Sequence, residues 1–187
     1  MAPEDVLAFW FGTGEAPRPE WFRKDAAFDA LITERFGATI EAALRGELAA
    51  WRDTPDGRLA EVIVLDQFTR NAFRDTPRAF AGDAPALARA REMLVRGDDR
   101  TLPPLKRWFA YMPLEHAENL AAQEQSVQLF EALAADAPEH CGSAFDYALR
   151  HHQVVQRFGR FPHRNAILGR RSTPAELAFL EQPGSRF

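Results

Sequence analysis

The 187-residue sequence contains one cysteine, only two lysines and no excess of positive charge. The single cysteine, Cys141, excludes an internal disulfide and a cysteine-based zinc site, which favours a reducing compartment. With 23 Lys and Arg against 27 Asp and Glu, the net charge of −4 argues against coating of nucleic acid or anionic membrane by the field of the whole protein. Any basic site must therefore be local.

Long hydrophobic runs are also missing. The apolar run at residues 6–11 follows acidic residues, so it lacks both the positive charge and the length of a signal peptide. The run from Leu59 to Phe68 is short and is interrupted by Glu61 and Asp66, which argues against a membrane span. We therefore expect a cytoplasmic protein without a membrane partner.

Helical periodicity dominates the chain, and no convincing strand-length alternation of apolar and polar residues occurs. The sequence predicts an all-α protein that forms a single domain over residues 1–187. Helices are expected at residues 4–10, 25–45, 56–72, 77–81, 84–96, 103–110, 114–135, 143–158 and 174–181. Short turns between them predict antiparallel helix pairs, although no 34-residue tetratricopeptide pattern is visible.

Three Thr-Pro pairs indicate helix starts, because a threonine hydroxyl can cap a helix whose first turn accommodates proline. They begin at Thr54, Thr76 and Thr173, and Glu176 completes a capping box with Thr173. The aromatic residues, 15 Phe and 4 Trp, crowd the N-terminal segment and are expected to pack on later helices.

The segment LDQFTRN (residues 65–71) places polar side chains in an otherwise apolar helix. An aspartate on an apolar face is costly unless it is paired, and a spacing of four lets Arg70 pair with Asp66. Two interpretations stay open: a structural ion pair between helices, or a functional site in which Asp66, Arg70 and Asn71 bind a ligand.

The segment YMPLEHAEN (residues 111–119) is the second polar group. Pro113 is expected to open a helix, which places Glu115, His116 and Glu118 in its first turns. In a structural interpretation, the acids stabilise the start of a helix and the histidine is partly buried. In a functional interpretation, Glu115 and His116 act as acid–base catalysts. Because the Glu-x-x-His and His-Glu-x-x-His spacings are absent, we expect no metal site, which would need ligands from other helices.

The segment RHHQVVQRFGRFPHRNAILGRR (residues 150–171) carries six Arg and three of the five His, without a single acid. Pro162 interrupts a helix, and the long loop that follows is of a kind that is often functional. Side chains that could bind phosphate or carboxylate are His152, Arg160, His163, Arg164, Asn165 and Arg170. Equally, these side chains could cap helix ends and pair with acids elsewhere.

Several established functional classes lack support. Arg and Phe together could bind nucleic acid, but the acidic balance argues against this partner. No Gly-x-Ser-x-Gly elbow, phosphate-binding P-loop or dinucleotide-binding glycine turn occurs. The cofactor requirement stays open.

These blocks resemble a bacterial family known as domain of unknown function 924, over nearly the full length. The resemblance is carried by VLAFWFG at 6–12, WF at 21–22, LDQFTRN at 65–71, PLEHAE at 113–118 and FGRFPHRNAILGRRST at 158–173. It implies a tetratricopeptide-like α-α superhelix and assigns no activity, cofactor or residue roles.

The main hypothesis is a site for a small anion, or an acid–base enzyme site, where the three polar segments converge. The alternative is a non-catalytic, tetratricopeptide-like module whose groove binds a peptide or a partner helix. A third interpretation is purely structural, with every polar segment used for helix ends and internal ion pairs.

Overall fold

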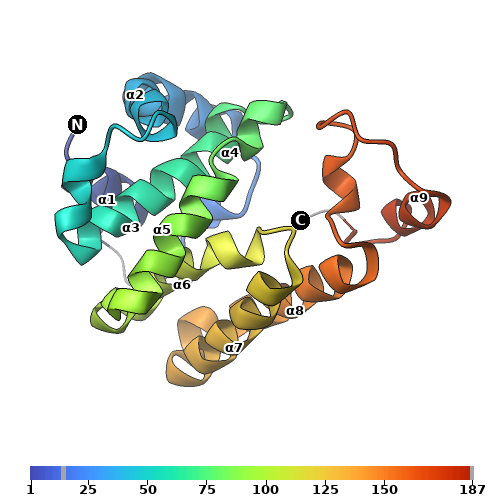
Figure 1. Cartoon of the computed structure of the whole chain (residues 1–187). Coiled ribbons are helices and arrows are strands. Elements are labelled where there is room, and N and C mark those ends of the chain that lie inside the picture. The colour runs from blue at the N-terminus through green and yellow to red at the C-terminus, as the bar shows by residue number, and fades with distance from the viewer. Residues whose placement is uncertain (14–15, 186–187) are drawn as a thin grey trace.

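The computed structural model describes residues 1–13 and 16–185, and helices connected by short turns make up this part of the chain (Figure 1). Its α-helices are α1 (Pro3–Phe11), α2 (Ala26–Leu44), α3 (Pro55–Ile63), α4 (Thr69–Ala72), α5 (Asp83–Arg96), α6 (Pro104–Glu115), α7 (Leu120–Asp136), α8 (Pro138–Phe158) and α9 (Pro174–Leu180). The described residues contain no strand, which confirms the predicted all-α class.

Shorter helical segments connect or interrupt these helices. The 3-10 helices are η1 (Pro19–Trp21), η2 (Ala49–Asp53), η4 (Pro77–Phe80), η5 (Asp98–Thr101) and η6 (Pro162–Arg164). A π-helix, η3 (Val64–Phe68), joins α3 to α4 without a break, so the helix predicted at 56–72 is continuous but contains a widened turn. The segment predicted as a helix at 77–81 is the 3-10 helix η4.

The helix boundary predicted at Pro113 is wrong. Pro113 lies inside α6, which continues to Glu115, and α7 begins only at Leu120. The start of α7 is set by Asn119, whose side chain accepts a hydrogen bond from the backbone N–H of Ala122 at 2.9 Å. Glu115 and His116 therefore lie at the C-terminal end of a helix, not in the first turn of the next one.

Of the three Thr-Pro pairs predicted to cap helix starts, two have a threonine side chain that caps the helix. Thr54 accepts a hydrogen bond from the backbone N–H of Gly57 at 3.1 Å, and Thr173 with Glu176 forms the predicted capping box. Thr76 instead donates its hydroxyl hydrogen to the carbonyl of Phe73, so its side chain does not cap the following helix.

The main hydrophobic core extends from α1 to α8. The N-terminal aromatic residues pack into it as predicted: the ring centroid of Trp10 lies 6.1 Å from that of Trp21 and 5.4 Å from that of Phe109. α7 and α8 pack along one another, with only Ala137 between them, and are therefore antiparallel neighbours (Figure 1).

The C-terminal segment, from the end of α8 through η6 to α9, has a small apolar cluster of its own. Val154, Val155 and Phe161 are buried, and Phe158 and Phe179 pack against them. In Figure 1 this segment lies beside the main helical body. Side chains on the facing surfaces of the two parts are therefore available to form a site.

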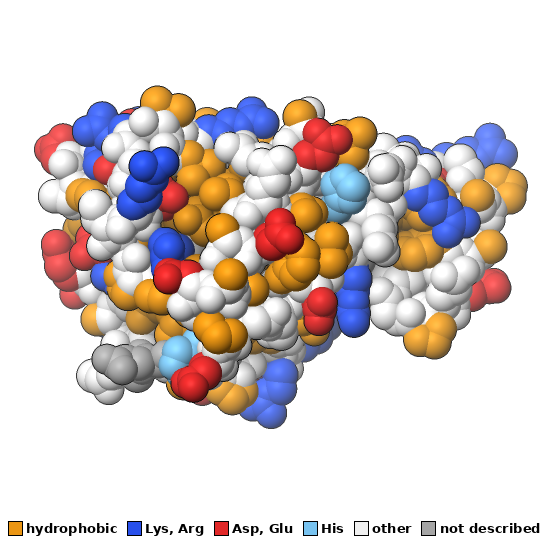
Figure 2. All heavy atoms as spheres, turned by 90° about the horizontal axis from the view of Figure 1, so that it is seen from below, with side chains coloured by type: hydrophobic (Ala, Val, Ile, Leu, Met, Phe, Trp, Pro, Cys, Tyr) orange, Lys and Arg blue, Asp and Glu red, His pale blue; other side chains and the backbone are white. Residues whose placement is uncertain are grey.

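Charged side chains are mixed on the face in Figure 2, where Lys and Arg alternate with Asp and Glu between apolar side chains. Within residues 1–13 and 16–185, none of the helices is both long enough and apolar enough to span a bilayer.

Gly82 provides a test of the close packing around η3. A Cβ at position 82 would lie 1.9 Å from the backbone oxygen of Leu65, so Gly82→Ala should lower the free energy of unfolding by about 1–3 kcal/mol. Gly142→Ala, within α8 and without neighbours inside 4 Å, should instead raise it by about 0.5–1 kcal/mol. Urea unfolding followed by circular dichroism measures both. Equal effects would contradict the steric argument.

Candidate functional site

A cavity of about 630 Å³ lies where the C-terminal segment faces the main body. Residues far apart in sequence line it, namely Arg70, Arg74, Asp75, Ala79, Phe80, His116, His151, Pro162, His163, Arg164, Ala166, Ile167, Ser172, Leu177 and Leu180. The three polar segments of the sequence each contribute to this surface. Of the predicted site residues, the cavity lining brings together Arg70, His116, His163 and Arg164.

Asp66 is a buried carboxylate in the π-helix η3, with 1% of its side chain exposed. Its oxygens lie 2.8 and 3.0 Å from His116 Nδ1 and 3.4 Å from Arg70 Nη1, and one accepts a hydrogen bond from Gln67 Nε2 at 2.6 Å. Burial acts to raise the pKa of Asp66, but Arg70 and His116 outweigh it and hold that pKa well below its usual range. The carboxylate is therefore charged, and the predicted pair with Arg70 is confirmed.

His116 is oriented by this carboxylate. Burial and the charge of Arg70 lower its pKa, against the opposing effect of Asp66, so the neutral imidazole is favoured at neutral pH. Since a carboxylate accepts from Nδ1, the hydrogen of the neutral ring lies on Nδ1 and the lone pair on Nε2. His116 thus offers one nitrogen for proton transfer or ligation.

Asp83, at the start of α5, joins two arginines. Its Oδ1 lies 2.8 Å from Arg70 Nη1, and its Oδ2 accepts a hydrogen bond from Arg164 Nη1 at 3.0 Å. Arg164 also donates from Nη2 to the backbone oxygen of His116 at 3.0 Å. These contacts hold the guanidinium groups of a body helix and of η6 close to one another at the cavity.

Arg164 is held more rigidly than an ordinary surface arginine. Its side chain is 7% exposed, and its guanidinium carbon lies 4.8 Å from the ring centroid of Phe80 and 4.5 Å from that of Phe161. Burial, with repulsion by Arg70, lowers its pKa to about 10, which leaves it charged at neutral pH. By contrast, burial and Arg164 lower the pKa of His163 to about 4, so His163 is neutral at neutral pH and could bind an anion only as a neutral hydrogen-bond donor.

Glu115 and His151 form a second buried group directly behind His116. His151 Nδ1 lies 3.0 Å from Glu115 Oε1 and 2.8 Å from the backbone oxygen of Tyr147. Burial, reinforced by the charge of Asp66, raises the pKa of Glu115 to about 8, while burial lowers the pKa of His151 to about 3. At neutral pH the contact therefore joins two neutral groups.

Other predicted ligand-binding residues make internal contacts, as the structural interpretation of the loop expected. Arg160 forms two hydrogen bonds with Glu176, at 2.7 and 2.9 Å. Arg170 binds both Glu118, at 2.5 and 2.8 Å, and Asn165, at 2.9 Å. These three predicted residues, Arg160, Asn165 and Arg170, hold the loop in place.

The remaining two predicted residues lie outside the cavity lining. Asn71 accepts a hydrogen bond from Arg74 at 2.8 Å, and His152 is half-buried on α8. Its neighbour His151, which lines the cavity, was not selected from the sequence. A signal was available, because Ala144, Ala148 and His151 recur at spacings of four and three and so share the buried face of α8.

Asp83 was also missed. In the sequence it resembles an ordinary acid in the first turn of a helix, where the macrodipole favours a negative charge. Only the packing of η6 against the start of α5 gives it a second role, as the bridge between Arg70 and Arg164.

Comparisons with known proteins cover nearly the whole chain. The family model described as "Bacterial protein of unknown function (DUF924)" matches residues 6–184. The solved structure of ATU0120, a protein of unknown function from Agrobacterium tumefaciens, is 40% identical, with a TM-score of 0.86 and 96% of each chain covered. None of the curated proteins compared with the chain matches it.

The Arg160–Glu176 contact predicts a pH-dependent contribution to stability. Hydrogen bonds from Arg160 outweigh burial and lower the pKa of Glu176 to about 2, so its stabilising effect is present above about pH 4.3 and is lost as the pH falls towards 2. Glu176→Gln should lower the free energy of unfolding at pH 7 by about 1.5–3 kcal/mol and by less near pH 2.

Urea unfolding between pH 2 and 7 measures this contribution. Glu181→Gln, at an exposed acid just after α9, is the matched control and should follow the wild type. A constant difference between Glu176→Gln and the wild type across this range would contradict the assignment.

Proposed function

Given that the chain belongs to the family of bacterial proteins of unknown function (DUF924), we propose that it binds a small organic anion, a carboxylate or a phosphate ester, in the cavity between the main body and η6. Arg70 and Arg164 bind the anionic group. Of the loop residues that the sequence suggested as anion ligands, only Arg164 is retained here, because Arg160 binds Glu176 and His163 is neutral; Arg70 comes from α4.

The observation that carries the proposal is a pair of buried donors without acceptors. Nη2 of Arg70 and Nε of Arg164 are buried and form no hydrogen bond within the described structure. Leaving a buried donor unsatisfied costs about 1–3 kcal/mol, and more for a charged group, so such atoms need an explanation. An anion bound between the two guanidinium groups would accept hydrogen bonds from both of them after a small movement of the arginine side chains.

The lining of the cavity indicates what the rest of the ligand is like. Phe80, Ile167, Leu177 and Leu180 provide apolar surface beside the arginines. A second cavity of about 440 Å³ shares Phe80, His116 and Arg164 with the first, and it too has largely apolar walls. A ligand with an anionic group and an apolar portion fits this surface better than a free inorganic ion does.

Glu115 and His116 are the residues that would act on such a ligand if it is a substrate. His116 lines both cavities, and Glu115 precedes it in the chain. The alternative, a tetratricopeptide-like interaction module, has less support. Among the residues that the structure describes, the large exposed hydrophobic residues lie on separate elements, namely Met1, Phe22, Leu31, Val95, Leu120, Tyr147 and Leu177.

Thermal unfolding in the presence of anions tests this proposal. A series of aliphatic and aromatic carboxylates and phosphate esters should raise the midpoint temperature of the wild type, with inorganic phosphate less effective. Arg164→Gln should abolish the rise, because Gln cannot supply a charged, planar donor fork. The variant should still fold, since Asp83 retains Arg70 as its partner.

Arg171→Gln is the matched control, because Arg171 belongs to the same loop but is exposed and does not line the cavity. It should respond to anions as the wild type does. A folded Arg164→Gln protein that retains the full response, or a wild type that responds to none of these anions, would disprove the proposal.

A further inference from the structure

We propose that Glu115, His116 and His151 form a site for one divalent transition-metal ion of the zinc type, at the inner end of the cavity. Binding of the ion does not depend on binding of the anion, because Arg70 and Arg164 would hold the anion whereas Glu115, His116 and His151 would hold the ion. Glu115 and His116 come from the end of α6, and His151 comes from the middle of α8.

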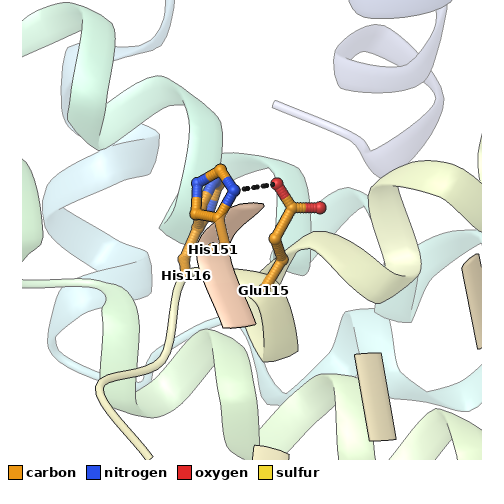
Figure 3. Close-up of side chains that lie close together, drawn as sticks. All are labelled: Glu115, His116 and His151. Atoms are coloured by element: carbon orange, nitrogen blue, oxygen red, sulfur yellow. Dashed lines mark ion pairs between the residues drawn. The ribbon is translucent and has the colours of Figure 1, made fainter. Parts of the chain in front are cut away.

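The three side chains are close enough to share one ion. Each offers one ligand atom, and these atoms all lie within 4.8 Å of one another. Zinc bonds to nitrogen and oxygen are about 2.0–2.2 Å, so two ligands of one tetrahedral ion lie roughly 3.3–3.6 Å apart, and side-chain rotation would have to bring the most distant pair closer by about 1 Å. Figure 3 shows the Glu115 carboxylate directed at the His151 imidazole, with His116 beside it.

The surroundings of His116 resemble those of a metal-ligating histidine. A metal-binding histidine generally donates its other ring N–H to a carboxylate or a backbone carbonyl, which fixes the ring. Asp66 serves His116 in this way, at 2.8 Å from Nδ1, and leaves Nε2 as the ligating nitrogen. In His151 the same nitrogen, Nδ1, lies 2.8 Å from the backbone oxygen of Tyr147 and 3.0 Å from Glu115 Oε1, so an ion held by this nitrogen would replace the contact with Tyr147.

The donor atoms at this point suit a cation, because a metal ion can replace the proton of a buried carboxyl group such as Glu115. Glu115 has 5% of its side chain exposed, and no Arg or Lys forms an ion pair with it among the residues that the structure describes. Asp66, which is charged, lies on the other side of His116. Two carboxyl groups and two imidazoles in a buried setting provide the nitrogen and oxygen donors that suit zinc-type ions.

The position of the three ligands indicates how such an ion would be used. Catalytic zinc sites keep three protein ligands and leave one position for water or substrate. His116 and His151 both line the cavity, so the open position would face the space beside Arg70 and Arg164. An ion there would polarise a bound carboxylate or phosphate, or lower the pKa of a bound water.

Isothermal titration of the chelator-treated full chain with Zn²⁺ tests the site. We expect one ion per chain, and at least a tenfold loss of affinity in both Glu115→Gln and His151→Ala. Asp66→Asn should weaken binding 10–100-fold, because Asp66 orients a ligand without touching the ion. Co²⁺ in place of Zn²⁺ should give visible absorption bands that these variants lose.

His140→Ala is the matched control, because His140 lies on the same helix but outside the cluster, and it should bind Zn²⁺ as the wild type does. Circular dichroism checks that each variant is folded, and the near-isosteric Glu115→Gln keeps the test decisive if an Ala variant unfolds. Arg164→Gln should retain metal binding, which separates failure of this site from failure of the anion site.

Two results would overturn the proposal. The first is a wild type that binds no Zn²⁺ under these conditions. The second is undiminished binding in folded Glu115→Gln and His151→Ala, which would place the ion elsewhere; a loss in His140→Ala would then place it near His140.

Discussion

A chain of alternating charges, Asp66–Arg70–Asp83–Arg164, joins the C-terminal segment to the helical body. Successive members approach to 3.4, 2.8 and 3.0 Å, and they belong to η3, α4, α5 and η6. Removing one member of a buried ion pair typically costs about 3–5 kcal/mol, whereas apolar residues of similar volume can be equally stabilising. The main effect of these charges is therefore to position side chains and not to add stability. They hold Arg70 and Arg164 beside the cavity, which apolar side chains in their place would not do.

The widened turn of η3 lies at the centre of this arrangement. π-helical turns are rare and occur frequently at functional sites. Here the turn holds Asp66, and Gly82 packs so closely against the backbone of Leu65 that a side chain would not fit. The Asp66 carboxylate itself is buried and contacts Arg70, His116 and Gln67. Asp66 thus contacts both Arg70 and His116, and Asp83 extends the chain of charges to Arg164.

Local patterns allowed much of the helical structure to be predicted. The spacing of apolar residues predicted α2 and α5 closely, and Thr54 and Thr173 marked true helix starts because their capping contacts are made within three residues. Pro113 was misinterpreted because proline normally favours a first turn. Burial of the surrounding α6 residues outweighs its missing hydrogen bond. The pairing of Asp66 with Arg70 was predictable for the same reason as the caps, since both residues lie on one helix.

The sequence by itself determined the all-α class, most helix starts and the three polar segments that contribute to the cavity. It did not determine which polar side chains would be used internally. Arg160 and Arg164 are four residues apart and chemically identical, yet Arg160 binds Glu176 whereas Arg164 lies between two aromatic rings with one donor unsatisfied. Likewise, only the packing of α8 against α6 brings His151 to Glu115 and His116. These outcomes depend on contacts between residues distant in sequence, which neither periodicity nor motif spacing can specify.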